Sequence, residues 1–417
     1  MTRTLRMSSF TRIVDDADGR RALVNLYTNE RVALDPELER ALPRVLEVDL
    51  DEPRASGERL LWQLCGYELA SRGILVPRDA DSERVERRFL DSLRALVDAP
   101  PFFGVPRATS DELAGVPAIA FLGVRSAEGA SYPGTASGPE LLRRASRRLV
   151  GDRGQPRDLV DGRGHRPFDG PAVVDLGDVD LRRRDLDAWL DAVEAIVAAL
   201  PATSRPVVVG GDHAMTYPVV KALYQRRGGR PFTLIQFDQH LDLQVRGELI
   251  GGRPRHHEPI THANFVSHVL ALDPAMRVVQ VGGAPYHSVP IANDAGWQQV
   301  RRDAVTQLSV LDIAAAGVDA IIRRLACDQD VYVTIDVDVL AAPTVRATGY
   351  PAPLGLDPAL LFRLIEAAIV GNRVLGVDLM EFGVAPPQAG PATEVEADLL
   401  ALLLCHVVSS LGPQLAR

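Results

Sequence analysis

Short, uniformly apolar segments alternate with longer amphipathic ones from about residue 116 to the end of the chain. The short segments predict buried strands, and the longer ones, such as 186–200, predict helices. The predicted strands are 118–122, 172–176, 206–209, 232–237, 277–281, 331–335 and 374–379. Strands that alternate with helices are typical of a parallel sheet covered on both faces, so this region is predicted to be an α/β domain.

The N-terminal part of the chain follows a different pattern. Two short strands, 22–27 and 32–34, are separated by the turn residues 28–30. A helix is predicted to begin at Asp35-Pro36, because Asp is a favoured N-cap and Pro a favoured first helical residue. A second helix and a closing strand over 73–77 complete a small α+β unit. The predicted organisation is an N-terminal domain over 1–80, a linker helix and Pro-rich segment over 81–115, and a second domain over 116–417.

Composition and charge limit the classes of protein that fit. The formal net charge is -9, and the arginines are interspersed with acidic residues, which argues against a nucleic-acid binder. The N-terminus lacks the apolar core of a signal peptide, and the apolar run over 399–408 is too short to cross a bilayer. Cys65, Cys327 and Cys405 form no CxxC pair, which favours free thiols in a reducing compartment. We expect a cytoplasmic protein that binds neither nucleic acid nor membrane.

Polar residues cluster directly after four of the predicted strands. These segments are Gly210-Gly211-Asp212-His213-Ala214, Asp238-Gln239-His240-Leu241-Asp242, Asp336-Val337-Asp338 and Met380-Glu381-Phe382. The carboxyl ends of parallel strands meet at one edge of the sheet, where such folds place their sites. Alternation along an extended chain also points Asp238, His240 and Asp242 to one side. Asp336 and Asp338 share a side for the same reason, so four aspartates and two histidines are expected to converge on one pocket.

The charges in this pocket would be too costly to bury without a partner. Two divalent cations would offset the four aspartates, and a ligand set that is mostly oxygen, with no thiolate, favours manganese over structural zinc. Two ions roughly 3.5–4 Å apart would also make a shared water a nucleophile at neutral pH. Taken singly, an Asp after a strand usually caps a helix, and a His after Gly-Gly usually belongs to a turn. The three motifs in this order favour the metal site.

These motifs resemble those of the ureohydrolase family, which includes arginase, agmatinase and formiminoglutamase. The family's GGDH, DxHxD and DxD motifs match 210–214, 238–242 and 336–338. Its longer signature aligns without a gap over 336–356, and its Gly-rich first loop resembles 129–139. The resemblance covers the chain from about residue 116 to the end. It implies a three-layer, arginase-like α/β fold with a mainly parallel sheet, and manganese-dependent hydrolysis of a guanidino group with release of urea.

The resemblance assigns roles to individual residues and implies two Mn²⁺ per subunit. One ion would take His213, Asp238, Asp242 and Asp336, and the other Asp238, His240, Asp336 and Asp338. On the substrate side the resemblance implies Thr348, Tyr350 and Glu381. The Glu381 carboxylate would pair with the guanidinium group, which stays charged at any working pH.

The family also uses a histidine between the second motif and the next strand to relay protons. His262 is the preferred candidate for this histidine, and His256 and His257 are the alternatives. In the implied mechanism, a water shared by the two ions attacks the trigonal carbon. The tetrahedral intermediate then collapses to urea and an amine, and Asp238 or His262 delivers the proton.

Several positions depart from the family's pattern. A small hydroxyl residue is replaced by Ala214, an Ala by Gln239, an Asp-Pro pair by Ala341-Ala342, and another small hydroxyl residue by Tyr350. An Arg that many members have is missing from 281–284, and 246–260 is longer than in enzymes for free arginine. Since the metal motifs are intact while residues around the substrate differ, a substrate other than free L-arginine is favoured.

Residues 1–80 are similar to the winged-helix domains that recognise leader peptides in enzymes that modify ribosomal peptides. Such domains bind the leader by adding a strand to the edge of a sheet. The resemblance implies a peptide arginase that converts arginine side chains of a precursor peptide to ornithine, with the docked leader raising the local substrate concentration. An oligomerisation or packing extension would explain the same segment.

Other functions fit the sequence as well. A small-molecule ureohydrolase, such as an agmatinase, an arginase or a guanidino-acid hydrolase, would carry the same motifs. An inactive member that serves as a peptide-binding module would not need the complete ligand set, and a single-zinc deacetylase of similar fold would not need His213 and Asp338. Relatives are commonly trimers or hexamers, so a homo-oligomer is expected unless the extra domain blocks those surfaces.

Overall fold

The computed structural model divides the chain into two compact units, residues 1–94 and 95–417. The described residues are 5–7, 11–15, 21–25, 31–47, 65, 69, 75–77, 96–130, 132–150, 168, 172–181, 186–243, 259–286, 304–384 and 390–415. The second unit contains all four polar segments that the sequence places after strands.

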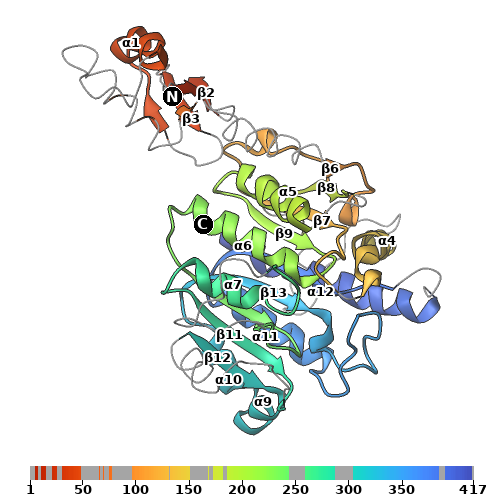
Figure 1. Ribbon diagram of the computed structural model, residues 1–417. Helices are drawn as coiled ribbons and strands as arrows, with labels where there is room; N and C mark the ends of the chain where they lie inside the picture. Colours follow the sequence, from red (N-terminus) through yellow and green to blue (C-terminus); the bar gives the residue numbers. More distant parts are fainter. Residues whose placement is uncertain are drawn as a thin grey trace. The chain divides into compact units, whose positions relative to one another are not determined.

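The second unit is built on a nine-stranded sheet, counted over the described residues, with the order β12-β11-β10-β13-β14-β9-β7-β8-β6 (Figure 1). Its strands are β6 (Leu96–Val97), β7 (Ala118–Val124), β8 (Ala172–Val179), β9 (Arg205–Val209), β10 (Thr233–Phe237), β11 (Arg277–Gly283), β12 (Val305–Ser309), β13 (Asp330–Asp336) and β14 (Arg373–Met380). All neighbouring strands are parallel except β6 and β8. The mainly parallel sheet is confirmed, and every strand that the sequence predicts in this unit is present.

Helices cover both faces of this sheet and give the unit three layers (Figure 1). They are α4 (Gly138–Val150), α5 (Leu186–Ala199), α6 (Thr216–Arg226), α7 (Phe265–Leu272), α9 (Val310–Ala316), α10 (Val318–Leu325), α11 (Pro358–Val370) and α12 (Pro391–Leu415). In one layer α5 packs against α6 and α6 against α7. In the other, α12 packs against both α4 and α11, and α10 contacts α11. The expected three-layer α/β fold is confirmed.

Among the described residues, a large hydrophobic cluster includes side chains from the sheet, α4, α11 and α12. Alternate strand residues, such as Val207 with Val209 on β9, belong to it, as expected for side chains that share one face of a strand. Helix α12 is long and apolar enough to cross a membrane, but 67% of its most apolar window is buried inside the structure. The apolar run over 399–408 is therefore the middle of a helix that contributes to this core.

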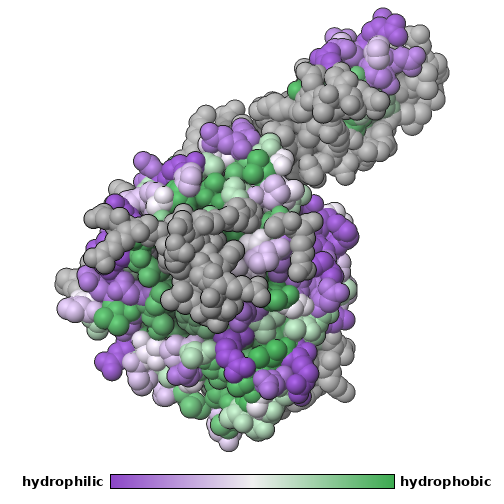
Figure 2. Space-filling view, turned by 180° about the vertical axis from the view of Figure 1, so that it is seen from behind, coloured by the Kyte–Doolittle hydropathy of each residue, from purple (hydrophilic) through white to green (hydrophobic). Residues whose placement is uncertain are grey.

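The outer surface of the second unit mixes residue types. Figure 2 shows hydrophilic and hydrophobic residues interspersed over its visible described part. Exposed arginines pair with acidic side chains, as Arg148 does with Asp398 at 2.8 Å and Arg373 with Asp328 at 2.6 Å. These pairs agree with solvated charged faces rather than with a basic binding patch.

Two strands of the sheet are absent from the sequence prediction. β12 contains Thr306 and Gln307 among apolar residues, and it lies at the edge of the sheet, where it pairs only with β11. β6 has only two residues and lies at the opposite edge. An edge strand is less enclosed than a central one, so it lacks the continuous apolar run that predicts a buried strand.

Residues 96–115 belong to the second unit, although the sequence assigns them to a linker. β6 pairs with β8, and Phe102 and Phe103 are buried in the main core. The N–H of Phe102 also donates a 2.7 Å hydrogen bond to the Asp175 carboxylate. This half of the predicted linker is thus part of a packed unit. The predicted boundary at residue 80 and the linker helix lie outside the described residues.

A buried arginine ties this segment to the sheet. Arg143 is 2% exposed, and its guanidinium lies 2.6 Å from Asp175 and 2.7 Å from Asp178. It also donates a 2.8 Å hydrogen bond to the carbonyl oxygen of Pro100 and stacks at 3.9 Å on the ring of Phe102. A buried charge is tolerated only when partners satisfy it, so this network fixes residues 100–102 against the two aspartates.

Replacing Arg143 with Met should lower the free energy of unfolding by about 3–5 kcal/mol, because the change removes the ion-pair partner of the buried Asp178 and leaves Asp175 with only the partly exposed Arg107, 3.0 Å away. Chemical denaturation measures the difference. Arg230→Met is the matched control, since Arg230 is exposed and its side chain donates to the Arg227 carbonyl oxygen. That control should change stability by less than about 0.5 kcal/mol. Equal losses in the two variants would contradict this role for Arg143.

The first unit contains two small antiparallel sheets and a helix. β2 (Thr11–Asp15), β3 (Arg21–Asn25) and β4 (Arg31–Ala33) form one sheet, and β1 (Leu5–Met7) pairs with β5 (Leu75–Pro77) in the other. Leu23, Leu34, Val45, Leu69 and Leu75 form its buried core. The predicted strands near 22–27, 32–34 and 73–77 are confirmed, and β1 and β2 are additional.

Helix α1 (Pro36–Glu47) begins where the sequence predicts. The Asp35 carboxylate accepts the N–H groups of Glu37 and Leu38 at 2.9 and 2.8 Å, which is the bonding expected of an N-cap. The predicted turn at 28–30 lies outside the described residues, and the winged-helix resemblance stays a prediction.

Candidate metal centre

The four polar segments follow four neighbouring strands. β10, β13, β14 and β9 are adjacent in the sheet in that order. Residues 238–242, 336–338, 381 and 213 lie at or just after their C-terminal ends. Because the strands are parallel, these ends share one edge of the sheet, which is the edge where the sequence predicts a site.

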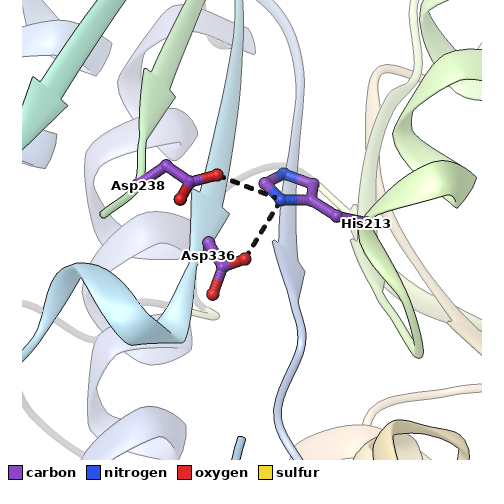
Figure 3. Close-up of side chains that lie close together, drawn as sticks. All are labelled: His213, Asp238 and Asp336. Carbon is purple, nitrogen blue, oxygen red and sulfur yellow. Dashed lines mark hydrogen bonds and ion pairs between the residues drawn. The ribbon is translucent and has the colours of Figure 1, made fainter. Parts of the chain in front are cut away.

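His213 lies among three aspartates from two other strand ends. Its Nδ1 atom is 3.3 Å from Asp238 Oδ2, 3.4 Å from Asp242 Oδ2 and 3.2 Å from Asp336 Oδ2. Figure 3 shows the imidazole pointing toward Asp238 and Asp336. The most exposed of these four side chains, Asp242, is only 10% exposed. One nitrogen of His213 is therefore surrounded by carboxylate oxygens that are shielded from water.

His240 lies beside the other oxygen of Asp238. Its Nδ1 atom is 2.9 Å from Asp338 Oδ2 and 3.6 Å from Asp238 Oδ1. Two groups of side chains could thus hold a metal ion, His213 with Asp238 and Asp336, and His240 with Asp238 and Asp338. Within each group the ligand atoms lie within 4.8 Å of one another. Since Asp238 belongs to both groups, the arrangement suits two neighbouring cations.

The ionisation of these groups also fits bound cations. Burial and the charges of Asp338 and Asp238 raise the pKa of Asp336 well above its usual value. Burial and Asp238 likewise raise the pKa of Asp338 to about 6. Burial opposes the charged form of His240, but its hydrogen bonds with Asp238 and Asp338 raise the pKa of the imidazole to about 12. Carboxylates and imidazoles that share protons so closely are groups that a metal ion would deprotonate on binding.

Local turns, rather than alternation along a strand, bring these ligands together. After β10, the N–H of His240 donates to Asp238 Oδ1 at 2.5 Å, and Asp242 has a left-handed φ of 48°. After β13, Asp336 caps a short turn by accepting the N–H of Asp338 at 2.9 Å. The convergence of the six side chains agrees with the sequence prediction, but the reason given for it, an extended chain, is wrong. Their assignment as ligands stays a prediction.

Glu381 faces the same space from the end of β14. Its φ of 65° is left-handed, a costly conformation for a non-glycine residue that tends to occur at functional sites. Its Oε1 atom accepts the N–H of His213 at 2.8 Å and lies 3.6 Å from His262 Nδ1. The Glu381 carboxylate is therefore placed directly beside the candidate ligands.

An aromatic side chain completes this part of the site. The Tyr350 ring stacks on the His262 ring and meets the His240 ring edge-on, with centroids 5.9 Å apart in both pairs. Thr348 is buried two residues earlier, and its contact with substrate stays a prediction. Of the three candidate relay histidines, the described residues include only His262. His256 and His257 lie outside them.

Four residues that the sequence analysis did not single out extend from His213 into the core. His213 Nε2 makes a 2.7 Å hydrogen bond with Thr334 Oγ1, which lies 3.3 Å from Thr216 Oγ1. Thr216 and Tyr332 donate their hydroxyl groups to Asp378 Oδ2 at 2.8 and 2.7 Å. Burial raises the pKa of Asp378. The sequence does contain an indication of this network. Thr334 and Asp378 lie within apolar strands, where a polar side chain needs a partner.

Thr334→Val should weaken the binding of Mn²⁺ by about 10–100-fold, because it removes the hydrogen bond that orients the His213 ring. Titration of the metal-free protein with Mn²⁺ measures the affinity. Thr233→Val is the matched control. Thr233 is the first residue of the neighbouring strand β10, and its hydroxyl group donates to Gln329 and to no candidate ligand. Equal Mn²⁺ affinities in the two variants would contradict this role for Thr334.

A family model described as the arginase family matches residues 117–408. Proclavaminate amidinohydrolase of Streptomyces clavuligerus is 30% identical over 280 residues, which cover 65% of this chain and 83% of that protein. A mitochondrial guanidino acid hydrolase of Homo sapiens is 30% identical, with 69% of this chain and 77% of that protein covered. The residues that the family model matches lie within the second unit.

Solved structures share the fold. Proclavaminate amidinohydrolase from Streptomyces clavuligerus superposes with a TM-score of 0.60 at 23% identity, over 78% of this chain and 99% of that one. Formiminoglutamase from Trypanosoma cruzi, solved with Mn²⁺, gives a TM-score of 0.59 at 18% identity, over 75% of this chain and 98% of that one. These likenesses agree with the three-layer arrangement of the second unit.

Proposed function

This chain belongs to the arginase family of hydrolases that act on guanidino and amidine groups, and we propose that it holds two manganese ions and converts arginine side chains of a ribosomal precursor peptide to ornithine, releasing urea. The observation that carries the reaction is the pair of ligand groups that share Asp238, with the Glu381 carboxylate beside them. The proposed substrate comes from the wall of the site and from the first unit.

The side chains of the site have different roles in the hydrolysis. When bound, the ion pair supplies a water that is a nucleophile at neutral pH. Glu381 pairs with the guanidinium and holds its carbon in front of the ligand groups. His262, 19% exposed and 3.6 Å from Glu381, delivers a proton to the departing amine. Asp238 is the second candidate for this transfer, although it also has to hold both ions.

The wall of the site supports a substrate without a free carboxylate. Tyr350 is 50% exposed and lines the site between the rings of His240 and His262. Among the described residues, the charged groups that contact His213, His240 and Glu381 are carboxylates and histidines, with no Lys or Arg. Free arginine would bring a carboxylate for which these side chains offer no cationic partner. An arginine within a peptide would not, and neither would agmatine, which is the second candidate.

The first unit favours the peptide over agmatine. In its three-stranded sheet, β2 and β4 each pair only with β3 among the described residues. Both strands therefore offer an edge to which an extended peptide can add by main-chain hydrogen bonds. A leader bound there would supply affinity that the catalytic pocket need not provide, because tethering raises the local concentration of the arginine.

One comparison of substrates tests the proposal. The manganese-loaded protein is incubated separately with arginine, agmatine and an arginine-containing precursor peptide encoded beside the enzyme. We expect the loss of CH2N2 from arginine side chains of the peptide, seen by mass spectrometry, and much slower release of urea from the two small molecules. Turnover of agmatine with none of any peptide would establish the second candidate instead.

A competition experiment tests the docking step on the full chain. An excess of the isolated leader segment should slow processing of the precursor peptide and leave hydrolysis of a small guanidino substrate unchanged. A leader of the same composition in scrambled order is the control. If the leader and its scrambled version act alike, the first unit does not recruit the substrate through that segment.

A further inference from the structure

Three glutamine side chains form a row across three adjacent strands beside the metal centre. Gln236 on β10 lies directly opposite Gln280 on β11, and Gln280 lies opposite Gln307 on β12. Gln236 and Gln280 are 0% and 2% exposed, whereas Gln307 is half-buried. A buried amide is costly unless its oxygen and nitrogen are both bonded, so each of these side chains is expected to have partners for both atoms.

The hydrogen bonds of the row all run toward the candidate ligands. The amide of Gln307 donates to Gln280 Oε1 at 3.2 Å. The Gln280 amide donates to Gln236 Oε1 at 2.9 Å and to the carbonyl oxygen of Leu241 at 2.6 Å. The Gln236 amide then donates to Asp238 Oδ2 at 2.7 Å and to Asp242 Oδ2 at 3.2 Å.

The acceptors at the end of the row fix the orientation of the buried amides. A backbone carbonyl and an ionised carboxylate can only accept, so the nitrogen of Gln280 must face Leu241 and that of Gln236 must face Asp238. With its nitrogen used in this way, Gln236 presents its oxygen to Gln280 as an acceptor. The orientation of Gln236 is thus set on one side by the aspartates and on the other by Gln280.

We propose that Gln236 is a positioning residue for the metal centre and that Gln280 holds it in the orientation in which it can act. One amide joins Asp238 and Asp242, the two aspartates from the segment after β10, at 2.7 and 3.2 Å. Its two N–H groups keep these carboxylates at a fixed separation and turn their Oδ2 atoms toward His213, which lies 3.3 and 3.4 Å away. The bond from the Gln280 amide to the Leu241 carbonyl oxygen holds Gln280 itself in the orientation that donates to Gln236.

The inference rests on the proposed manganese centre, and its first test measures Mn²⁺ affinity together with the thermal unfolding of the metal-free full chain. Gln236→Met keeps an unbranched side chain of similar length and removes both donors. We expect its Mn²⁺ affinity to fall by about 10–100-fold, as for other groups that orient metal ligands. Gln329→Met is the matched control, because Gln329 precedes β13 and bonds Thr233, away from the ligands.

The two measurements separate positioning from packing. A packing role would lower the unfolding temperature of metal-free Gln236→Met and leave the Mn²⁺ affinity of the folded protein at the wild-type value, which would overturn the inference. A wild-type protein that binds no Mn²⁺ would instead remove the proposed function. If Gln236→Met does not fold, Gln280→Met is measured in its place. Gln280 donates to Gln236 and Leu241 and to no carboxylate, yet its replacement should still weaken Mn²⁺ binding.

A double substitution tests whether the two glutamines act in series. If Gln280 acts by orienting Gln236, the variant with both residues changed to Met should bind Mn²⁺ about as weakly as Gln236→Met alone. Losses that add would mean that the two residues act independently. Additive losses would overturn the role assigned to Gln280.

Discussion

Asp238→Asn should release the bound manganese and abolish hydrolysis. One oxygen of Asp238 lies 3.3 Å from His213 and the other 3.6 Å from His240, so loss of its charge weakens both ligand groups at once. Asn has nearly the same size, so the effect comes from charge rather than packing. We expect kcat/KM to fall by about 10³-fold or more, since a metal pair contributes several kcal/mol and each factor of ten corresponds to about 1.4 kcal/mol.

Metal analysis and steady-state kinetics on the same preparation measure this prediction. Asp319→Asn is the matched control, because Asp319 is an exposed aspartate on α10 whose ion-pair partner, Arg363, is 3.6 Å away. It should keep both its manganese and its turnover. An Asp238→Asn protein with full metal content and full turnover would contradict the proposed mechanism.

Glu381→Gln should have the opposite signature, with manganese retained and hydrolysis slowed. The amide oxygen of a glutamine can still accept the N–H of His213, which the carboxylate accepts at 2.8 Å, so the ligand groups keep their geometry. The negative charge that pairs with the guanidinium is lost. Because breaking a buried charge pair costs about 2–5 kcal/mol, we expect kcat/KM to fall by roughly 10²–10³-fold.

A second buried glutamate provides the control for Glu381. Glu396 on α12 is 8% exposed and accepts the N–H of Ala347 at 2.9 Å, without contact to a candidate ligand. Glu396→Gln should lower kcat/KM by less than about tenfold. If Glu381→Gln loses its manganese, or if the two variants slow hydrolysis equally, Glu381 does not have the substrate role assigned to it.

The sequence predicts the second unit well because its strands are central and buried. A strand covered on both faces carries a continuous apolar run, and the polar segments that end β9, β10, β13 and β14 stand out against it. The parallel arrangement alone places these segments at one edge of the sheet, whereas the order of the strands comes from the structure. The sequence therefore places His213, Asp238 and Asp336 at one edge of the sheet, and the structure agrees.

Two kinds of feature could not be predicted from the same pattern. β12 lies at the sheet edge, and its mixed residues, including Gln307, do not resemble a buried strand. The contacts of Gln236, Thr334 and Asp378 depend on the register between strands that are far apart in sequence. A polar residue inside an apolar strand indicates that a partner exists, but only the pairing of the strands identifies the partner.

The turns around the ligands also could not be predicted from the pattern of apolar and polar residues. Alternation along a strand predicts that residues two apart share a side, whereas Asp242 owes its position to a left-handed backbone conformation. Glu381 has a similar conformation. Non-glycine residues rarely adopt a left-handed conformation, so the sequence does not predict one for Asp242 or Glu381.

A crystal structure of the manganese-loaded protein, with anomalous scattering recorded at the manganese absorption edge, would show whether two ions share Asp238. We expect two anomalous peaks, one among His213, Asp238 and Asp336 and one among Asp238, His240 and Asp338, with Asp238 in contact with both. A single peak, or peaks away from these side chains, would contradict it.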